Sequence, residues 1–469
     1  MSPPPIRPEQ LAALPPDVRA VVEAIIEHYE RRIAELEAEL SGLRKTPQNS
    51  SLPSSTQHPH AKPVKPQPKS KNNRGGQPGH AKHERPLIPS EDCDEVIPLK
   101  PAACRGCGRK LSGADPAPHR HQVYELPEIQ PIITEYQQHR LRCSCGITTR
   151  APLPAGVPSG QSGPKLIAFV ALLMACFRQS KRRTSLFVTS ILNIPCCPSL
   201  TVKHQTIATQ ALQPAYAELV AALPTQTQLN GDESPTKEGP VKSWLWTFVA
   251  PAFTVFALRG SRAATAIREL LGETFAGVMS CDRAKMYWQC GRLQWCWAHL
   301  KRDFQALIDD PDRQVKRLGH DLMRPTKELF RHWSRCRDGT ITRRGFERLM
   351  RPIRQEIDSL LRRGVFSENP RLIGMCRELH DHRAWLWTFL EVEGIEPTNN
   401  AAERSLRHAV IWRKLSFGTQ SAAGSRFVET LLTVIETCRQ QDRNALAFVT
   451  HTVEAHFHGH AAPSLRPGV

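Results

Sequence analysis

Residues 229–282 read LNGDESPTKEGPVKSWLWTFVAPAFTVFALRGSRAATAIRELLGETFAGVMSCD, and this stretch decides the fold. Short runs rich in β-branched and aromatic residues are separated by Gly and Pro, a pattern typical of strands joined by tight connections. One amphipathic helical pattern precedes the last run. We predict strands over Leu229–Glu233, Ser243–Val249, Phe253–Leu258 and Gly277–Asp282 and a helix over Arg262–Leu271. The order is therefore strand, strand, strand, helix, strand.

Carboxylates stand on the first and the fourth of these strands, at Asp232 and Asp282. This order of elements, with acids in these places, is that of a ribonuclease H-like core, an α/β fold. If the two strands are neighbours in the sheet, the two carboxylates repel each other unless a cation neutralises them. Carboxylate oxygens are typical ligands of hard cations, so the pair predicts Mg²⁺ or Mn²⁺.

A third carboxylate, Glu403, lies far downstream in PTNNAAERSLR (397–407), which is otherwise basic and has the pattern of a helix. Thr398 or Asn399 can cap that helix, so Glu403 lies about one turn inside it. Two metal ions about 3.5–4 Å apart would activate an attacking oxygen and stabilise the leaving oxygen in phosphoryl transfer. The alternative is a solvated helix whose single acid forms a surface ion pair. The predicted catalytic and magnesium-binding residues are Asp232, Asp282 and Glu403.

Two cysteine pairs, each followed by Gly, lie upstream in residues 91–155. Thiolate pairs on tight turns suit a tetrahedral zinc ribbon, so we predict structural zinc on Cys104, Cys107, Cys143 and Cys145. The second pair is one residue short, and His139 could replace one sulfur; two unrelated cysteine pairs are the alternative. Cys296 and His299 also have ligand-like spacing. Without a second pair nearby we expect no structural zinc there, and His299 either orients a phosphate or water or packs in the core.

The N-terminal part is predicted to contain a coiled coil and a linker. Apolar residues recur at alternating spacings of four and three within 17–44, the period of a coiled-coil seam that favours self-association. The seam residues are Val22, Ile26, Tyr29, Ile33, Leu36, Leu40 and Leu43. Residues 45–90, rich in Pro, Ser, Lys and Gly, predict a flexible basic linker that either contacts phosphates or is only solvated.

Residues 160–225 predict a helical block with helices over Leu166–Phe177 and Ser185–Leu192, and a third over Val202–Leu223 that Pro214 kinks or divides. A helix-turn-helix DNA reader and a plain packing module both fit this pattern. The apolar run Leu166–Phe177 is 12 residues long, short of the ~20 that a membrane helix needs. We further predict a catalytic domain over 226–440, with a helical insertion at about 303–390, and a C-terminal tail over 441–469.

The composition favours an anionic partner. The 469 residues carry a net charge of +18 and a pI near 9.5, with the basic residues collected in particular stretches. The residues predicted to contact nucleic acid are Lys69, Lys71, Arg74, Arg182, Arg183, Lys203, Arg404, Arg407, Arg413 and Lys414. Fourteen cysteines spread over a basic chain without a signal sequence predict a reducing compartment, so we expect the protein in the cytoplasm, associated with the nucleoid.

Three blocks of the sequence resemble insertion sequence 66 family transposases. The C-terminal block NNAAERSLRHAVIWRKLSFGTQSAAGSRFVETLLTVIETC (399–438) is similar to the signature of that family. WCWAHLKRDF (295–304) resembles its Cys-x-Ala-His block, and GDESPTK (231–237) its first-aspartate block. The N-terminal coil, GGQPGH (75–80) and the cysteine pairs are similar to its leader region. One departure is that DRAKMYW (282–288) keeps a single tyrosine, Tyr287, where the family has two.

This resemblance implies a DDE transposase with Asp232, Asp282 and Glu403 as metal ligands. By the family mechanism, water cuts at the ends of the element and the freed 3′-hydroxyl attacks target DNA. The resemblance also implies DNA ends and target DNA as partners, a homo-oligomer, and small accessory transposition proteins. A catalytically inactive DNA-binding relic and a structure-specific nuclease of the same fold are the alternatives.

Overall fold

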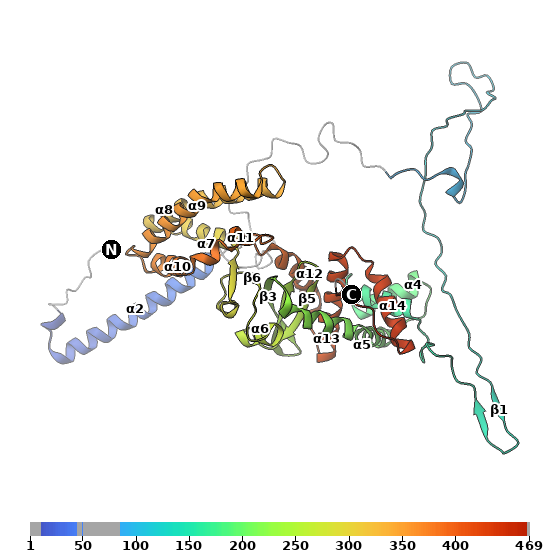
Figure 1. The fold of residues 1–469 in the computed structure, drawn as a ribbon, viewed down its shortest axis with the longest axis horizontal. Coiled ribbons are helices and arrows are strands. Elements are labelled where there is room, and N and C mark those ends of the chain that lie inside the picture. Colours follow the sequence, from blue (N-terminus) through green and yellow to red (C-terminus); the bar gives the residue numbers. More distant parts are fainter. Residues whose placement is uncertain (1–10, 45–48, 50–84, 467–469) are drawn as a thin grey trace. The chain divides into compact units, whose positions relative to one another are not determined.

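The computed structural model describes residues 11–44, 49 and 85–466. The chain divides into two compact units, Pro59–Pro131 and the remainder, and each is described by itself. Among the described residues, no helix is long and apolar enough to cross a membrane. The architecture is α/β, as predicted, with one five-stranded mixed sheet and many helices (Figure 1).

The N-terminal helix α2 spans Pro16–Arg44, close to the range predicted for the coil. Tyr29, Ile33 and Leu36 of the predicted seam are exposed, whereas Val22 and Ile26 are partly buried. The side chains of Leu40 and Leu43 lie outside the described residues. The apolar seam therefore has exposed members in a single chain, and its pairing with a second copy stays a prediction.

Residues 85–131 of the smaller unit contain one short 3₁₀ helix, η2 (Ser90–Asp92), and are otherwise irregular. The larger unit resumes with a short antiparallel hairpin of β1 (Arg140–Arg142) and β2 (Thr148–Arg150). The predicted linker residues 45–90 fall largely outside the described residues.

A block of three helices follows: α3 (Pro164–Ala175), α4 (Lys181–Ile191) and α5 (Pro198–Ala222), with η3 (Leu223–Thr225) after it. Helix α4 begins four residues earlier than predicted because the Ser180 side chain caps it, accepting the N–H of Arg183. Helix α5 begins at Pro198, since proline fits the first helical turn. Pro214 does not divide it, because the helix continues through this residue to Ala222.

The sheet has the strand order β5-β4-β3-β6-β7, with β3 at its centre. Its elements are β3 (Gln228–Glu238), β4 (Val241–Val249), β5 (Thr254–Arg259), α6 (Ala264–Leu271), β6 (Val278–Cys281), η4 (Lys285–Gln289) and β7 (Arg292–Trp295). Strands β3, β4 and β5 are antiparallel, while β3, β6 and β7 are parallel. The predicted order of strands and helix is therefore present, but β3 runs past Asp232 to Glu238 instead of ending at Glu233. Strand β7 was not predicted.

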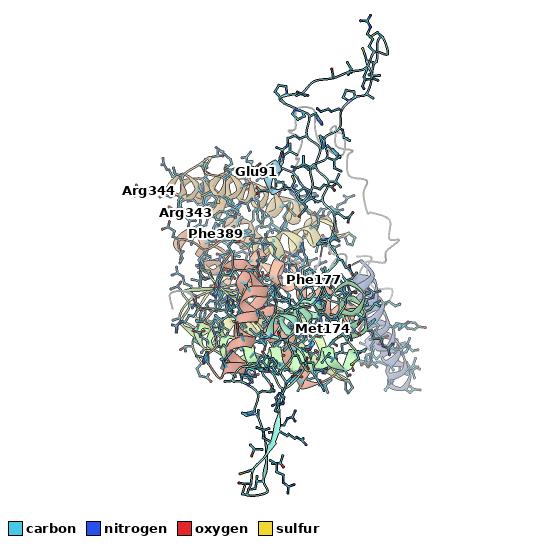
Figure 2. All side chains as sticks on the ribbon, turned by 90° about the vertical axis from the view of Figure 1, so that its right-hand side faces the viewer. Glu91, Met174, Phe177, Arg343, Arg344 and Phe389 are labelled. Carbon is cyan, nitrogen blue, oxygen red and sulfur yellow. The ribbon has the colours of Figure 1, made fainter. Side chains whose placement is uncertain are left out.

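A long helical segment lies between β7 and the last three helices of the chain. It comprises α7 (Trp297–Ile308), α8 (Arg313–Arg337), α9 (Arg343–Val365), α10 (Pro370–Asp381), η5 (Arg383–Leu386) and α11 (Thr388–Glu391). Arg343 at the start of α9 donates a hydrogen bond to the carbonyl oxygen of Phe389, and Figure 2 labels both residues. Trp387 is buried against Trp297, with ring centroids 5.0 Å apart, so it packs in the core.

Three helices close the fold: α12 (Asn400–Ser416), α13 (Ala422–Gln440) and α14 (Ala445–His458). Helix α14 lies in the segment predicted as a tail. It packs against α3 and α5 because Phe448, Val449 and Val453 form a buried apolar stripe.

Helix α13 covers the open edge of β5 (Figure 1). Its side chains accept three backbone N–H groups of β5: Thr254 to Thr437 Oγ1 at 3.2 Å, Phe256 to Thr433 Oγ1 at 2.9 Å, and Leu258 to Glu429 Oε2 at 2.9 Å. Four residues of helix rise about 6 Å and two residues of strand about 6.6 Å, so the two spacings match. The helix therefore supplies the acceptors that a sixth strand would supply.

Candidate active site

Two of the predicted acids come together through the register of the parallel strands. Asn230 of β3 pairs with Ser280 of β6, and Asp232 and Asp282 each follow two residues later. Asp232 accepts the N–H of Glu233 at 2.9 Å, and Asp282 accepts the N–H of Ala284 at 2.8 Å. Equal offsets in a parallel pair put the two carboxylates at the same level of the sheet.

The start of α12, the helix that carries the third acid, is fixed to β3. Asn399 donates its side-chain Nδ2 to the carbonyl of Gly231 at 2.7 Å, and its backbone N–H lies 3.2 Å from Cys296 Sγ. The predicted capping role of Asn399 is therefore wrong in one respect: it precedes the helix, but its side chain bonds to β3 instead of to the first helical turn. Glu403 follows in that first turn.

The charges of the neighbouring acids act on Asp232. The pKa of Asp232 is raised well above its usual range, first by burial and then by the negative charges of Glu233, Asp282 and Glu403. Within the part of the chain that the structure describes, neither Asp232 nor Asp282 forms an ion pair with a protein cation. The site therefore holds more negative charge than its own side chains neutralise, which fits a bound cation.

Glu233 belongs to the same region, although sequence reasoning assigned it no role. Its carboxylate bonds to Arg262 Nη2 at 2.6 Å and accepts the Tyr287 hydroxyl at 2.6 Å. Burial is the main reason why the pKa of Glu233 is raised, with Asp282 the next contribution. A Cβ on Gly231 would lie 2.9 Å from Met279 Sδ and 3.0 Å from Tyr287, so only glycine fits beside this network. The only signal in the sequence was the tyrosine retained after Asp282.

Cys296 and His299 lie next to Glu403. Cys296 directly follows β7 and His299 is in the first turn of α7. The ligand atoms of Cys296, His299 and Glu403 all lie within 4.8 Å of one another, and His299 Nδ1 is 3.5 Å from Glu403 Oε1. Arg302 Nη2 approaches the same carboxylate oxygen at 3.4 Å. Burial raises the pKa of the Cys296 thiol to about 11 and, together with Arg302, lowers the pKa of His299.

Most of the described residues predicted to contact nucleic acid are exposed, and one of them bonds to another part of the protein. Arg182, Arg183, Lys203, Arg404, Arg407 and Lys414 are exposed. Arg413 is half-buried and donates to Ser234 Oγ at 3.0 Å and to the carbonyl of Pro235. The guanidinium of Arg413 thus binds β3, and its contact with nucleic acid stays a prediction. Lys69, Lys71 and Arg74 lie outside the described residues.

Each predicted zinc pair forms a tight turn. Gly108 N–H bonds to Cys104 O at 2.9 Å, and Gly146 N–H bonds to Cys143 O at 2.9 Å. Hydrogen bonds from the neighbouring backbone, led by Cys107 and Cys145 respectively, lower the pKa of Cys104 and of Cys143, which favours thiolates. The two pairs belong to different compact units, so a site formed by all four cysteines stays a prediction.

Comparison with known proteins agrees with these features. The chain is 25% identical over 409 residues to the uncharacterized protein y4qI of Sinorhizobium fredii, covering 77% of this chain and 72% of that one. It is 22% identical over 400 residues to the uncharacterized protein y4hP of the same organism, covering 76% of this chain and 71% of that one. The family model described as "Transposase IS66 family" matches residues 159–426, more than half of the chain, and this range contains all three carboxylates. The chain therefore belongs to the IS66 family of transposases.

Proposed function

We propose that the protein is a DDE transposase that cleaves the ends of an insertion sequence and joins the freed 3′-hydroxyl to target DNA. Asp232, Asp282 and Glu403 would be its catalytic acids, carried on a ribonuclease H-like core. The observation that supports the proposal most is the equal register of Asp232 and Asp282 on neighbouring parallel strands, with the charges of Asp282 and Glu403 both raising the pKa of Asp232.

The donor set fits Mg²⁺ or Mn²⁺, because the three residues offer oxygen ligands only. The ions, when bound, supply Lewis acidity and lower the pKa of an attacking water. Asp232 and Asp282 would be held rigidly by the sheet, while Glu403 would be oriented by α12 through the Asn399–Gly231 hydrogen bond. Exposed Arg404 and Arg407, close to Glu403 on α12, would bind the phosphodiester backbone beside the acids.

The remaining parts of the chain would serve DNA binding and assembly. We propose that helix α2 joins copies of the protein, that the cysteine pairs bind structural zinc, and that the α3–α5 block contacts DNA through its exposed basic residues. The working compartment would be the cytoplasm at the nucleoid, and accessory transposition proteins would be further partners.

The test is an end-cleavage and strand-transfer assay on duplexes that carry the DNA flanking the gene, with Mg²⁺. We expect Asp232→Asn to lower cleavage at least roughly a hundredfold, about 2.7 kcal/mol of transition-state stabilisation, and to leave end binding intact. Glu273→Gln, which changes an acid with an 86% exposed side chain, is the control and should keep full activity.

The outcomes separate the alternatives. Wild-type protein that binds ends and never cleaves them would mean an inactive relic. Cleavage of junctions without joining a 3′-hydroxyl to new DNA would mean a nuclease. Full cleavage by Asp232→Asn would contradict the assignment of the acids.

A further inference from the structure

We propose that Cys296, His299 and Glu403 form a second metal site, selective for zinc-class ions, that shares Glu403 with the acidic cluster. The binding itself does not depend on the proposed transposase chemistry, whereas its effect on cleavage does.

The geometry is close to that of a metal site. The three ligand atoms lie within 4.8 Å of one another. Ligands bonded to tetrahedral zinc at ~2.0–2.3 Å are roughly 3.3–3.8 Å apart, so small side-chain movements close the site. The imidazole is already 3.5 Å from the carboxylate. His299 lies in α7 and Glu403 in α12, and Cys296 is the single residue between β7 and α7, so regular elements hold the ligands in place.

The polar groups around the site are incompletely paired. Among the described residues, His299 Nδ1 is buried without a hydrogen-bond partner, and so is Asn399 Oδ1. Leaving a buried polar atom unpaired is unfavourable, so such atoms call for an explanation. A bound ion gives His299 Nδ1 a partner. The Asn399 N–H, 3.2 Å from Cys296 Sγ, would stabilise a thiolate there.

The donor types select the metal. Thiolate and imidazole prefer zinc-class ions to Mg²⁺, whereas an all-oxygen site has the opposite preference. On binding, the Cys296 thiol gives its proton to solvent and its sulfur bonds to the ion. Three protein ligands leave the fourth position open, which is typical of exchangeable sites and not of closed structural ones.

Sharing Glu403 makes the two sites compete. A carboxylate drawn toward Cys296 and His299 is no longer available to Asp232 and Asp282. Zn²⁺ would therefore act against Mg²⁺ by removing the third acid from the cluster.

Co²⁺ binding to the full chain tests the site without an activity assay, because Co²⁺ bound to thiolate absorbs in the near ultraviolet. The background is a variant with Cys104, Cys107, Cys143 and Cys145 replaced by Ser, so that the other predicted thiolate site is silent. We expect one equivalent of Co²⁺ to give the charge-transfer band and Cys296→Ser to abolish it. Cys376→Ser, which changes an equally buried cysteine in α10, should leave the band unchanged.

A folding defect in Cys296→Ser would also abolish the band. Glu403→Gln is therefore a second test, because it removes a ligand and leaves the thiol in place. It should weaken Co²⁺ binding at least about tenfold. A band that survives Cys296→Ser, or binding unaffected by Glu403→Gln, would overturn the proposal and leave the three residues as a packed polar contact.

A second measurement connects the site to function. Zn²⁺ at the concentration of the protein should inhibit Mg²⁺-dependent cleavage, and Cys296→Ser should reduce the fractional inhibition. If the wild type never cleaves DNA, the proposed function fails while the Co²⁺ result still decides the metal site.

Discussion

At the scale of single residues, the partly buried Asp232 is a source of instability in the metal-free protein. Its pKa is raised, so the folded state binds a proton more tightly than the unfolded chain does. The stability that this proton contributes is complete below the ordinary pKa near 3.8 and is lost as the pH rises through the raised value. We therefore expect Asp232→Asn, without metal, to melt at a higher temperature than wild type at neutral pH, with a gap that widens from pH 4 to pH 8.

Thermal denaturation at each pH, with and without Mg²⁺, measures this effect. Mg²⁺ should raise the melting temperature of the wild type and have little effect on Asp232→Asn, since the ligand set is broken. Glu273→Gln should follow the wild type throughout. A gap that stays constant with pH would contradict the assignment of the effect to the Asp232 charge.

At the scale of elements, the contact of α13 with β5 depends on helix side chains. They accept the backbone N–H groups of β5 that a neighbouring strand would otherwise accept. Thr433→Val leaves the Phe256 N–H without its 2.9 Å acceptor, so the free energy of unfolding should fall by about 1–3 kcal/mol. Thr430 lies on the same helix and is equally buried, but its hydroxyl has no partner among the described residues. Thr430→Val is therefore the matched control and should be neutral or slightly stabilising.

Urea denaturation of the two variants is the measurement. Equal losses for Thr433→Val and Thr430→Val would mean that methyl packing, and not the hydrogen bond to the sheet edge, sets the stability of this contact.

At the scale of the whole molecule, the predicted coil would connect copies of the chain. Ile33 belongs to the predicted seam and is 54% exposed in α2. Ile33→Glu should convert an oligomer to monomers, because charges in the seam of a short coil repel. Val21→Glu changes an apolar residue outside the seam that is 60% exposed, so the oligomer should persist. Analytical ultracentrifugation separates the two results, and identical behaviour of both variants would remove α2 as the association element.

Local patterns sufficed for the features that depend on neighbouring residues. The order of strands, the strand-end position of Asp282 and the helix around Glu403 follow from hydropathy and turn residues within short windows. The placement of Asp232 was predictable as well, although the strand continues beyond it because Val241–Val249 pairs with its whole length.

Contacts between residues that are distant in the sequence could not be predicted from short windows. Cys296 and Glu403 are brought together only when α12 docks on β3. The same holds for Glu233, whose partners are Arg262, in the loop before α6, and Tyr287, in η4. Arg413 looked like a DNA contact because its neighbours are basic, and only the fold shows that it binds Ser234.

The closure of the β5 edge has a consequence for biosynthesis. Ribosomes make β5 before the whole helical segment and release α13 only near the end of translation. Until then the nascent chain presents the β5 N–H groups to any other extended polypeptide. A chain truncated between Glu403 and Ala422 would keep all three acids but would lack α13, the helix that covers β5. Its defect would be aggregation through the uncovered strand, not a missing catalytic group.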